Sequence, residues 1–168
     1  MKLLSIDPGY ERLGVAVIEK LPKQKEVLVF SECFKTSAKL PHHERLALIG
    51  GRIQEIIKKY KPEVLATEKL FFSGNQKTAM LVAEARGVIL YAASSAGLDI
   101  FEYTPADIKI AVTGYGKSEK RQIIEMVKRL IDVKKIQPLK ESGGHMTTNS
   151  DDEFDAIAIG LTHCAIHR

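Results

Sequence analysis

Four acidic residues stand where a folded chain could bring them together. Asp7 ends an apolar run at the start of the chain, just before a Pro-Gly turn, and Glu68 ends a second apolar run. Asp152 and Asp155 open an apolar segment of helical type near the C-terminus. Carboxylates delivered by the ends of distant elements are the oxygen ligands that Mg²⁺ or Mn²⁺ prefers. The pattern therefore predicts a divalent metal site.

Most of these acids also have a purely structural explanation. Asp7 could be a turn residue, because Asp is common before Pro-Gly. Asp151, Asp152 and Glu153 all suit a helix N-terminus through the macrodipole. Asp155 lies deeper in the helix, and its spacing of three from Asp152 places both on one face. We therefore rank Asp155 first and Asp152 second as ligands from this helix, above Asp151 and Glu153.

Phosphodiester hydrolysis is the chemistry that such a carboxylate cluster serves. The reaction needs a water that is nucleophilic at neutral pH and a leaving oxygen whose charge is neutralised. Two divalent cations about 4 Å apart do both. Asp7 is the natural bridging ligand, because it ends the most rigid predicted element. We expect two Mg²⁺ or Mn²⁺ ions per site.

Length and composition limit the class of protein. A chain of 168 residues with 45% hydrophobic content can bury one core but not two, so we expect one domain over residues 1–168. The sequence has neither an apolar run of about 18 residues nor a signal peptide, so we expect a cytoplasmic protein. Cys33 and Cys164 fit no metal or disulfide pattern, which predicts buried or idle thiols.

Positive charge is concentrated in one region. Residues 107–140 hold nine Lys or Arg against four Asp or Glu, a local balance of +5, whereas the whole chain carries +4. Such a stretch suits the backbone of a nucleic acid. The alternative is a set of solvated helix surfaces, which Lys and Arg also cover.

The pattern of apolar residues predicts an α/β fold. Three strands come first, at residues 2–7, 13–19 and 26–33, and form an antiparallel meander. Helices and strands follow in the order helix 41–60, strand 63–68, a helix to about 96, strand 98–103, a helix capped by Thr104, helix 118–131 and helix 151–167. Residues 134–150 lack periodicity, so we expect a mobile loop there. The result is a mixed five-stranded sheet with helices on both faces.

Four blocks in this order resemble the RuvC family of Holliday junction resolvases, within the ribonuclease H-like superfamily. The blocks are Asp7-Pro-Gly with Gly14; Glu68 with Phe71, Phe72, Asn75 and Ala85-Arg-Gly-Val88; Lys109 before Gly114-Tyr-Gly116 and Lys120; and Asp152-Glu-Phe-Asp-Ala-Ile-Ala with Thr162-His163. The resemblance covers nearly the whole chain. It implies a ribonuclease H-like fold and a homodimeric, metal-dependent endonuclease that cuts two opposed strands of a four-way DNA junction in recombination and repair. It also implies a partnership with the RuvA-RuvB branch-migration complex.

The resemblance carries over to individual residues. By position, the catalytic and metal-binding acids are Asp7, Glu68, Asp152 and Asp155. Lys109 and Lys120 match basic residues near the cut phosphate, and Phe71 matches an aromatic residue that meets the junction bases.

Other DNA-binding candidates follow from the residues themselves. Phe71 and Phe72 could both anchor the core, but one of them is free to stack on an exposed base. Lys117 and Arg121 flank Lys120 in the basic stretch and are candidates for phosphate contact. We expect His163, two turns beyond the acids, to pack in the core or behind the site.

Three alternative functions stay open at this point. The block at residues 10–17 is closer to YqgF-type relatives, which implies a nuclease that processes ribosomal RNA. An Asp-x-Gly turn after a first strand also builds the phosphate loop of actin-like ATPases, but those need two such lobes. A junction-binding protein without activity is the third, and a complete set of acids argues against it.

Overall fold

The computed structural model describes residues 1–70, 76–133, 146–147 and 150–167. The elements are β1 (Lys2–Asp7), β2 (Arg12–Glu19), β3 (Val27–Lys35), α1 (His42–Tyr60), β4 (Val64–Glu68), α2 (Gln76–Ser95), β5 (Asp99–Tyr103), α3 (Pro105–Thr113), α4 (Lys120–Leu130), β6 (Met146–Thr147) and α5 (Asp151–Ile166). Each element that the sequence predicts is present. Thr104 caps α3 as expected, because its hydroxyl accepts a hydrogen bond from the backbone N–H of Asp107.

The strands form one mixed sheet in the order β5-β4-β1-β2-β3-β6. β1, β2 and β3 are the predicted antiparallel meander, and β4 and β5 run parallel beside β1. The predicted five strands are confirmed. The two-residue strand β6 adds to the edge at β3 and falls inside the predicted loop, because so short a segment leaves no periodic signal. Residues 134–145 and 148–149 of that loop lie outside the described residues.

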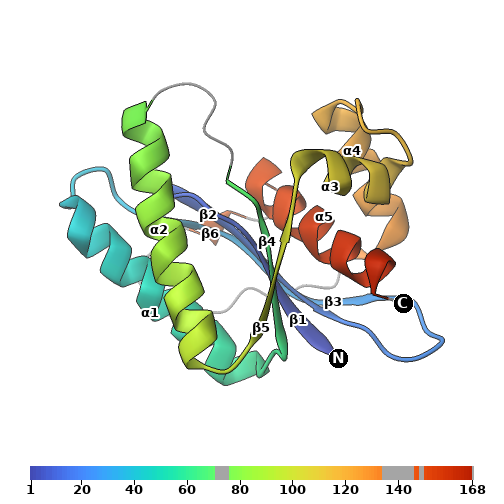
Figure 1. Ribbon diagram of the computed structural model, residues 1–168, viewed down its shortest axis with the longest axis horizontal. Helices are drawn as coiled ribbons and strands as arrows, with labels where there is room; N and C mark the ends of the chain where they lie inside the picture. The colour runs from blue at the N-terminus through green and yellow to red at the C-terminus, as the bar shows by residue number, and fades with distance from the viewer. Residues whose placement is uncertain (71–75, 134–145, 148–149, 168) are drawn as a thin grey trace.

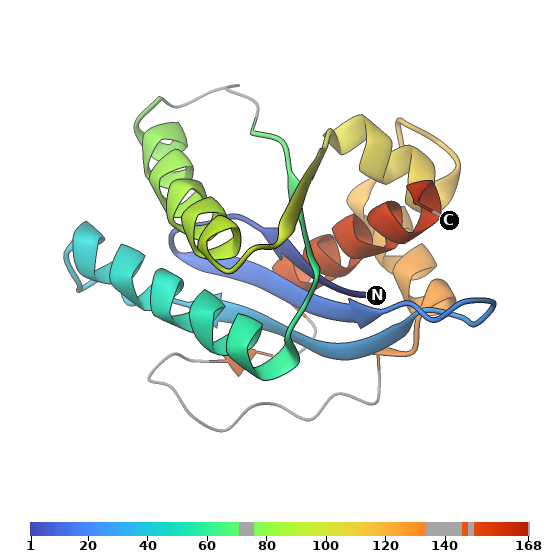
Figure 2. The same cartoon turned by 60° about the horizontal axis from the view of Figure 1, so that its bottom comes forward.

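Helices cover both faces of the sheet, as Figures 1 and 2 show. α1 and α2 pack on one face, where Ile53 and Ile89 meet Leu4 and Ile6 of β1. α5 packs on the other, and α3 and α4 pack against α5, in a second core that includes Ile157. The sheet therefore separates two apolar layers. The carboxyl ends of the parallel strands β1, β4 and β5 lie between the two groups of helices.

Strand alternation directs two of the predicted acids to the α5 face. Leu3 of β1 belongs to the core beneath α5, so Asp7, four residues later, faces the same way. Ala66 of β4 belongs to that core as well, so Glu68 also points toward α5. Because β1 and β4 are parallel neighbours, both acids lie at the same edge of the sheet.

Two glycines let α5 lie unusually close to the sheet. A Cβ at Gly14 would stand 2.0 Å from the carbonyl oxygen of Asp152. A Cβ at Gly160 would stand 2.7 Å from both Ile18 and Ser5. Any larger side chain at either position would push the helix away from β1 and β2.

The remaining predictions for single residues concern the core. His163 is buried, as expected, and its Nδ1 lies 2.7 Å from the Tyr103 hydroxyl. Burial, with smaller contributions from His167 and Lys20, lowers the pKa of His163 to about 4, so the ring is neutral at pH 7. Cys33 and Cys164 are buried free thiols. Among the described residues, no helix is long and apolar enough to cross a membrane.

We predict that Gly14→Ala destabilises the protein because the added methyl group displaces the first turn of α5. The free energy of unfolding should fall by about 1–3 kcal/mol, as for other overpacked positions. Gly51→Ala is the matched control: its Cβ would meet nothing within 4 Å, so this exposed position in α1 should gain about 0.5–1 kcal/mol. Urea unfolding measures both changes in stability. Unchanged stability of Gly14→Ala would contradict the close docking of α5.

Candidate active site

Three elements bring the four predicted acids to one edge of the sheet. Asp7 and Glu68 end the neighbouring strands β1 and β4, and α5 begins directly opposite them with Asp152 and Asp155. The Ser150 hydroxyl starts this helix by accepting a hydrogen bond from the backbone N–H of Glu153 at 3.3 Å.

The acids are crowded enough to affect one another's ionisation. Burial, together with the charges of the three neighbouring carboxylates, raises the pKa of Asp7 to about 8. Burial and the charge of Asp155 raise the pKa of Glu68. Burial also raises the pKa of Asp155, although Lys120 acts in the opposite direction. Negative charge at this edge is therefore poorly compensated by the protein itself.

The donor set fits a hard divalent cation. All four side chains offer carboxylate oxygens, and a cation would offset the repulsion that raises the pKa of Asp7. Their arrangement is more open than a closed coordination shell: in the part of the chain that the structure describes, no three His, Cys, Asp or Glu side chains form a metal-binding group. Holding an ion therefore requires side chains to turn inward.

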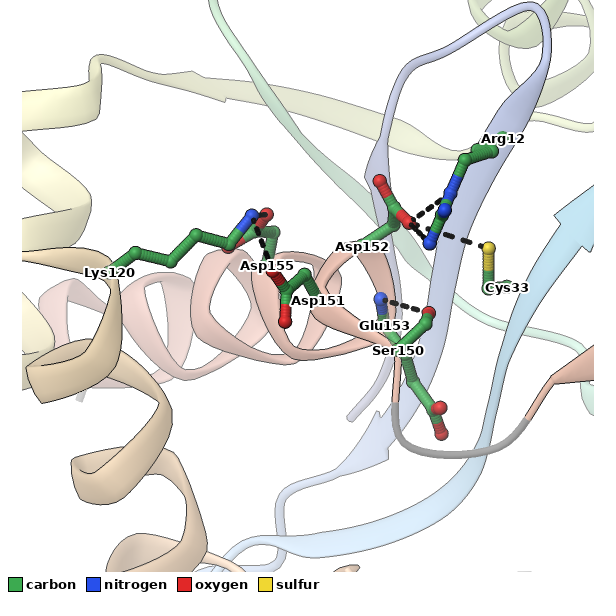
Figure 3. A network of polar contacts seen from close by, with 8 residues as sticks. All are labelled: Arg12, Cys33, Lys120, Ser150, Asp151, Asp152, Glu153 and Asp155. Carbon is green, nitrogen blue, oxygen red and sulfur yellow. Dashed lines mark hydrogen bonds and ion pairs between the residues drawn. The ribbon is translucent and has the colours of Figure 1, made fainter.

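Two basic residues contact the acids of α5 from opposite sides. Arg12 of β2 binds Asp152, with its Nε 2.7 Å and its Nη2 2.6 Å from Oδ2. On the other side of the helix, Lys120 Nζ lies 2.8 Å from Asp155 Oδ2 and 3.7 Å from Asp151. Figure 3 shows the two cations approaching α5 from opposite directions.

The predicted DNA-binding residues lie at different distances from the acids. Lys120 is at the site, and Lys109 lines a cavity of about 260 Å³ together with Glu68 and Asp155. Lys117 is exposed in the segment between α3 and α4. Arg121 is exposed and pairs with Glu125 at 3.0 Å on the surface of α4. Phe71 and Phe72 lie outside the described residues.

A second cavity, of about 280 Å³, lies on the α2 side of the acids. Its lining includes Asp7, Glu68 and Val82. Glu68 and Pro105 line both cavities, so hollows flank the carboxylates toward α2 and toward α3 and α4. The carboxylates are therefore accessible from both sides.

Sequence reasoning missed Arg12 and the role of Glu153. Arg12 lies two residues before Gly14, the register partner of Asp7, and a polar residue at that strand end was the available signal. Glu153 was ranked low as a ligand, and it turns away from the other acids: it is buried, and the Ser31 hydroxyl of β3 donates a hydrogen bond to it. This contact fixes the first turn of α5 to the sheet.

The fold and the site together define a ribonuclease H-like nuclease. The family described as "Crossover junction endodeoxyribonuclease RuvC" matches residues 3–163. A relative with that name from Halothermothrix orenii is 42% identical over 163 residues, which cover 97% of this chain and 92% of the relative. The relative from Brevibacillus brevis is 40% identical and covers 97% and 91% of the two chains.

A solved structure agrees with the sequence comparisons. "T. thermophilus RuvC in complex with Holliday junction substrate" superposes with a TM-score of 0.85 at 33% identity, covering 100% of this chain and 95% of that one. The chain belongs to the RuvC family of crossover junction endodeoxyribonucleases. The family is one of hydrolases that depend on divalent metal ions.

We predict that Asp7→Asn stabilises the protein in metal-free buffer. The folded-state pKa of Asp7 is raised above its unfolded value, so this group opposes folding more and more as the pH rises from 3.8 toward 8. At about 1.4 kcal/mol per pKa unit before solvent screening, the variant should gain about 1–4 kcal/mol at pH 8 and almost nothing at pH 4.

Urea unfolding in EDTA at several pH values measures this gain. Asp99→Asn, at an exposed position that begins β5, serves as the control and should show no such trend. A gain from Asp7→Asn that is the same at pH 4 and pH 8 would show that Asp7 is not crowded by its neighbours.

Proposed function

We propose that this protein resolves Holliday junctions by metal-dependent hydrolysis of two symmetric phosphodiester bonds. The observation that carries the proposal is the convergence of Asp7, Glu68, Asp152 and Asp155 on one sheet edge in a member of the RuvC family. The likeness to a RuvC bound to a Holliday junction supports four-way DNA as the substrate.

We propose that the four carboxylates hold two Mg²⁺ ions, or Mn²⁺ in their place. The bound ions supply the activation of the attacking water and the neutralisation of charge on the leaving oxygen. The charges of Glu68, Asp152 and Asp155 all raise the pKa of Asp7, so Asp7 is close to each of them. This supports a bridging role for Asp7.

The basic residues position the DNA in this account. Lys120 and Lys109 lie beside the acids, so each can pair with a phosphate next to the cut. We propose Lys117 and Arg121 as outer phosphate contacts, and Phe71 or Phe72 as the residue that stacks on a junction base.

Two symmetric cuts require two active sites, so we propose a homodimer. The exposed face of α2 supports this. Met80 and Tyr91 are 64% and 71% exposed, and Glu84 and Gly87 lie between them at helical spacing. A Cβ at Gly87 would meet nothing within 4 Å, so this stretch of the helix is open to close approach by a partner.

The remaining parts of the proposal rest on family membership. We propose that the protein acts in the cytoplasm on junctions delivered by the RuvA-RuvB complex. Co-sedimentation with RuvA-RuvB on a junction tests the partnership, and failure to bind there would reject it. Processing of ribosomal RNA is not favoured by the family match. Structured RNA that competes equally with a DNA junction would restore that alternative.

We predict that Asp7→Asn and Asp155→Asn cleave a mobile four-way junction at least about a thousandfold more slowly while still binding it. The amide is a poor ligand for the ions, whereas binding depends on Lys and Arg contacts to phosphates. Asp151→Asn, at an exposed neighbour on the same helix turn, is the matched control and should stay active. Cleavage and gel-shift assays on one junction decide the matter. An active Asp7→Asn protein would sink the proposed metal site.

We predict that Tyr91→Glu weakens the dimer about thirtyfold or more, because a buried aromatic residue at an interface contributes about 2 kcal/mol. Light scattering at micromolar concentration measures the change. Leu48→Glu replaces an exposed apolar residue on α1 and should leave the dimer intact. If Tyr91→Glu stays dimeric, the interface lies elsewhere; if the parent is a monomer that still cuts junctions, the homodimer itself is wrong.

A further inference from the structure

Arg12 forms an ion pair with Asp152, one of the four acids of the site. This residue begins β2, and both its Nε and its Nη2 reach the Oδ2 atom of Asp152, at 2.7 Å and 2.6 Å. The Cys33 thiol donates a weaker contact to the same oxygen at 3.6 Å. The oxygen of Asp152 that faces β2 therefore has three hydrogen-bond donors around it (Figure 3).

This contact fixes one oxygen of Asp152 toward β2. Arg12 draws Asp152 toward β2, whereas Lys120 draws Asp155 toward α4. The two acids share one helix face but are held by cations on opposite sides. A divalent ion that binds Asp152 and Asp155 through the Oδ2 atoms that Arg12 and Lys120 now contact must displace these contacts.

The guanidinium of Arg12 is accessible from solvent. Its side chain is 48% exposed, whereas the Asp152 side chain is only 24% exposed. An exposed ion pair contributes little to stability, so a stronger competitor can replace it. A phosphate is such a competitor, because the planar fork of arginine binds two phosphate oxygens at once.

We propose that Arg12 couples DNA binding to metal binding at this site. In the free protein Arg12 holds Asp152, and on junction binding its guanidinium transfers to a backbone phosphate and leaves Asp152 available as a metal ligand. This inference rests on the proposed function of the chain as a metal-dependent resolvase. It adds a residue that holds an acid of the site until the substrate arrives.

The coupling between DNA binding and metal binding must be equal in both directions, and this can be measured. If DNA frees Asp152 for the metal, then the metal must strengthen DNA binding by the same factor. Removing Arg12 should therefore have two effects. The free protein should bind metal more tightly, and the mutual strengthening of metal and DNA binding should shrink.

The first arm measures Mn²⁺ binding to the DNA-free protein by electron paramagnetic resonance. Arg12→Gln should bind Mn²⁺ about two- to fivefold more tightly than the parent, since the competing ion pair is gone. Arg12→Lys keeps the charge but lacks the fork, and should lie between the two. Lys58→Gln, exposed in the last turn of α1, removes the same charge at the opposite end of the sheet and should match the parent.

The second arm measures junction affinity in EDTA and in Ca²⁺, a cation whose loose coordination departs from the octahedral geometry of Mg²⁺. Ca²⁺ should tighten junction binding by about fivefold or more in the parent and by less than about twofold in Arg12→Gln. Unchanged Mn²⁺ affinity in Arg12→Gln, or equal tightening by Ca²⁺ in both proteins, would overturn the role of Arg12. If the parent protein cuts junctions, either of these results rejects the role of Arg12 and leaves the proposed function intact. If the parent protein cuts no junction, the proposed function itself is wrong.

Discussion

The close docking of α5 on β1 and β2 is the constraint on which the site depends. Asp7 and Glu68 are fixed by strands that are neighbours in the sheet, but their partners on α5 come from a distant part of the chain. Gly14 and Gly160 remove the side chains that would hold the helix away. The Ser31 contact to Glu153 then ties the first turn of α5 to β3. Four carboxylates thus meet where the protein alone cannot neutralise them.

The crowding of these carboxylates lowers the stability of the fold, and it also favours the binding of a cation. An acid whose pKa is raised to about 8 opposes folding at neutral pH, and a fold keeps such a group only where the rest of the structure can tolerate the cost. Arg12 and Lys120 reduce the cost for the acids of α5. Among the residues that the structure describes, Asp7 forms no ion pair with a basic side chain. The charge of Lys120 lowers the pKa of Asp7 without a direct contact. Asp7 is thus the acid that gains most from a bound cation.

Much of this arrangement could be predicted from the sequence because it depends on local pattern. The apolar runs at residues 2–7 and 63–68 predict the strands, and Asp7 and Glu68 stand at their ends. The spacing of Asp152 and Asp155 predicts their shared helix face. The order of elements then predicts the mixed sheet.

The contacts that cross the fold could not be predicted in the same way. The pairing of Arg12 with Asp152 joins residues 140 positions apart, and no local pattern marks it. The buried pair of Arg52 and Glu32 joins α1 to β3, although each residue alone resembles an ordinary surface charge. Glu153 had the same appearance as its neighbours at the start of α5, and only its burial separates it from them.

Anomalous diffraction from crystals grown with Mn²⁺ tests the central claim most directly, because it locates the metal without relying on activity. We expect a Mn²⁺ peak bound to Asp7, with Glu68 and at least one of Asp152 and Asp155 turned toward it and released from its basic partner. A protein crystal saturated with Mn²⁺ that shows no peak at Asp7, or a peak only elsewhere on the chain, would contradict the account.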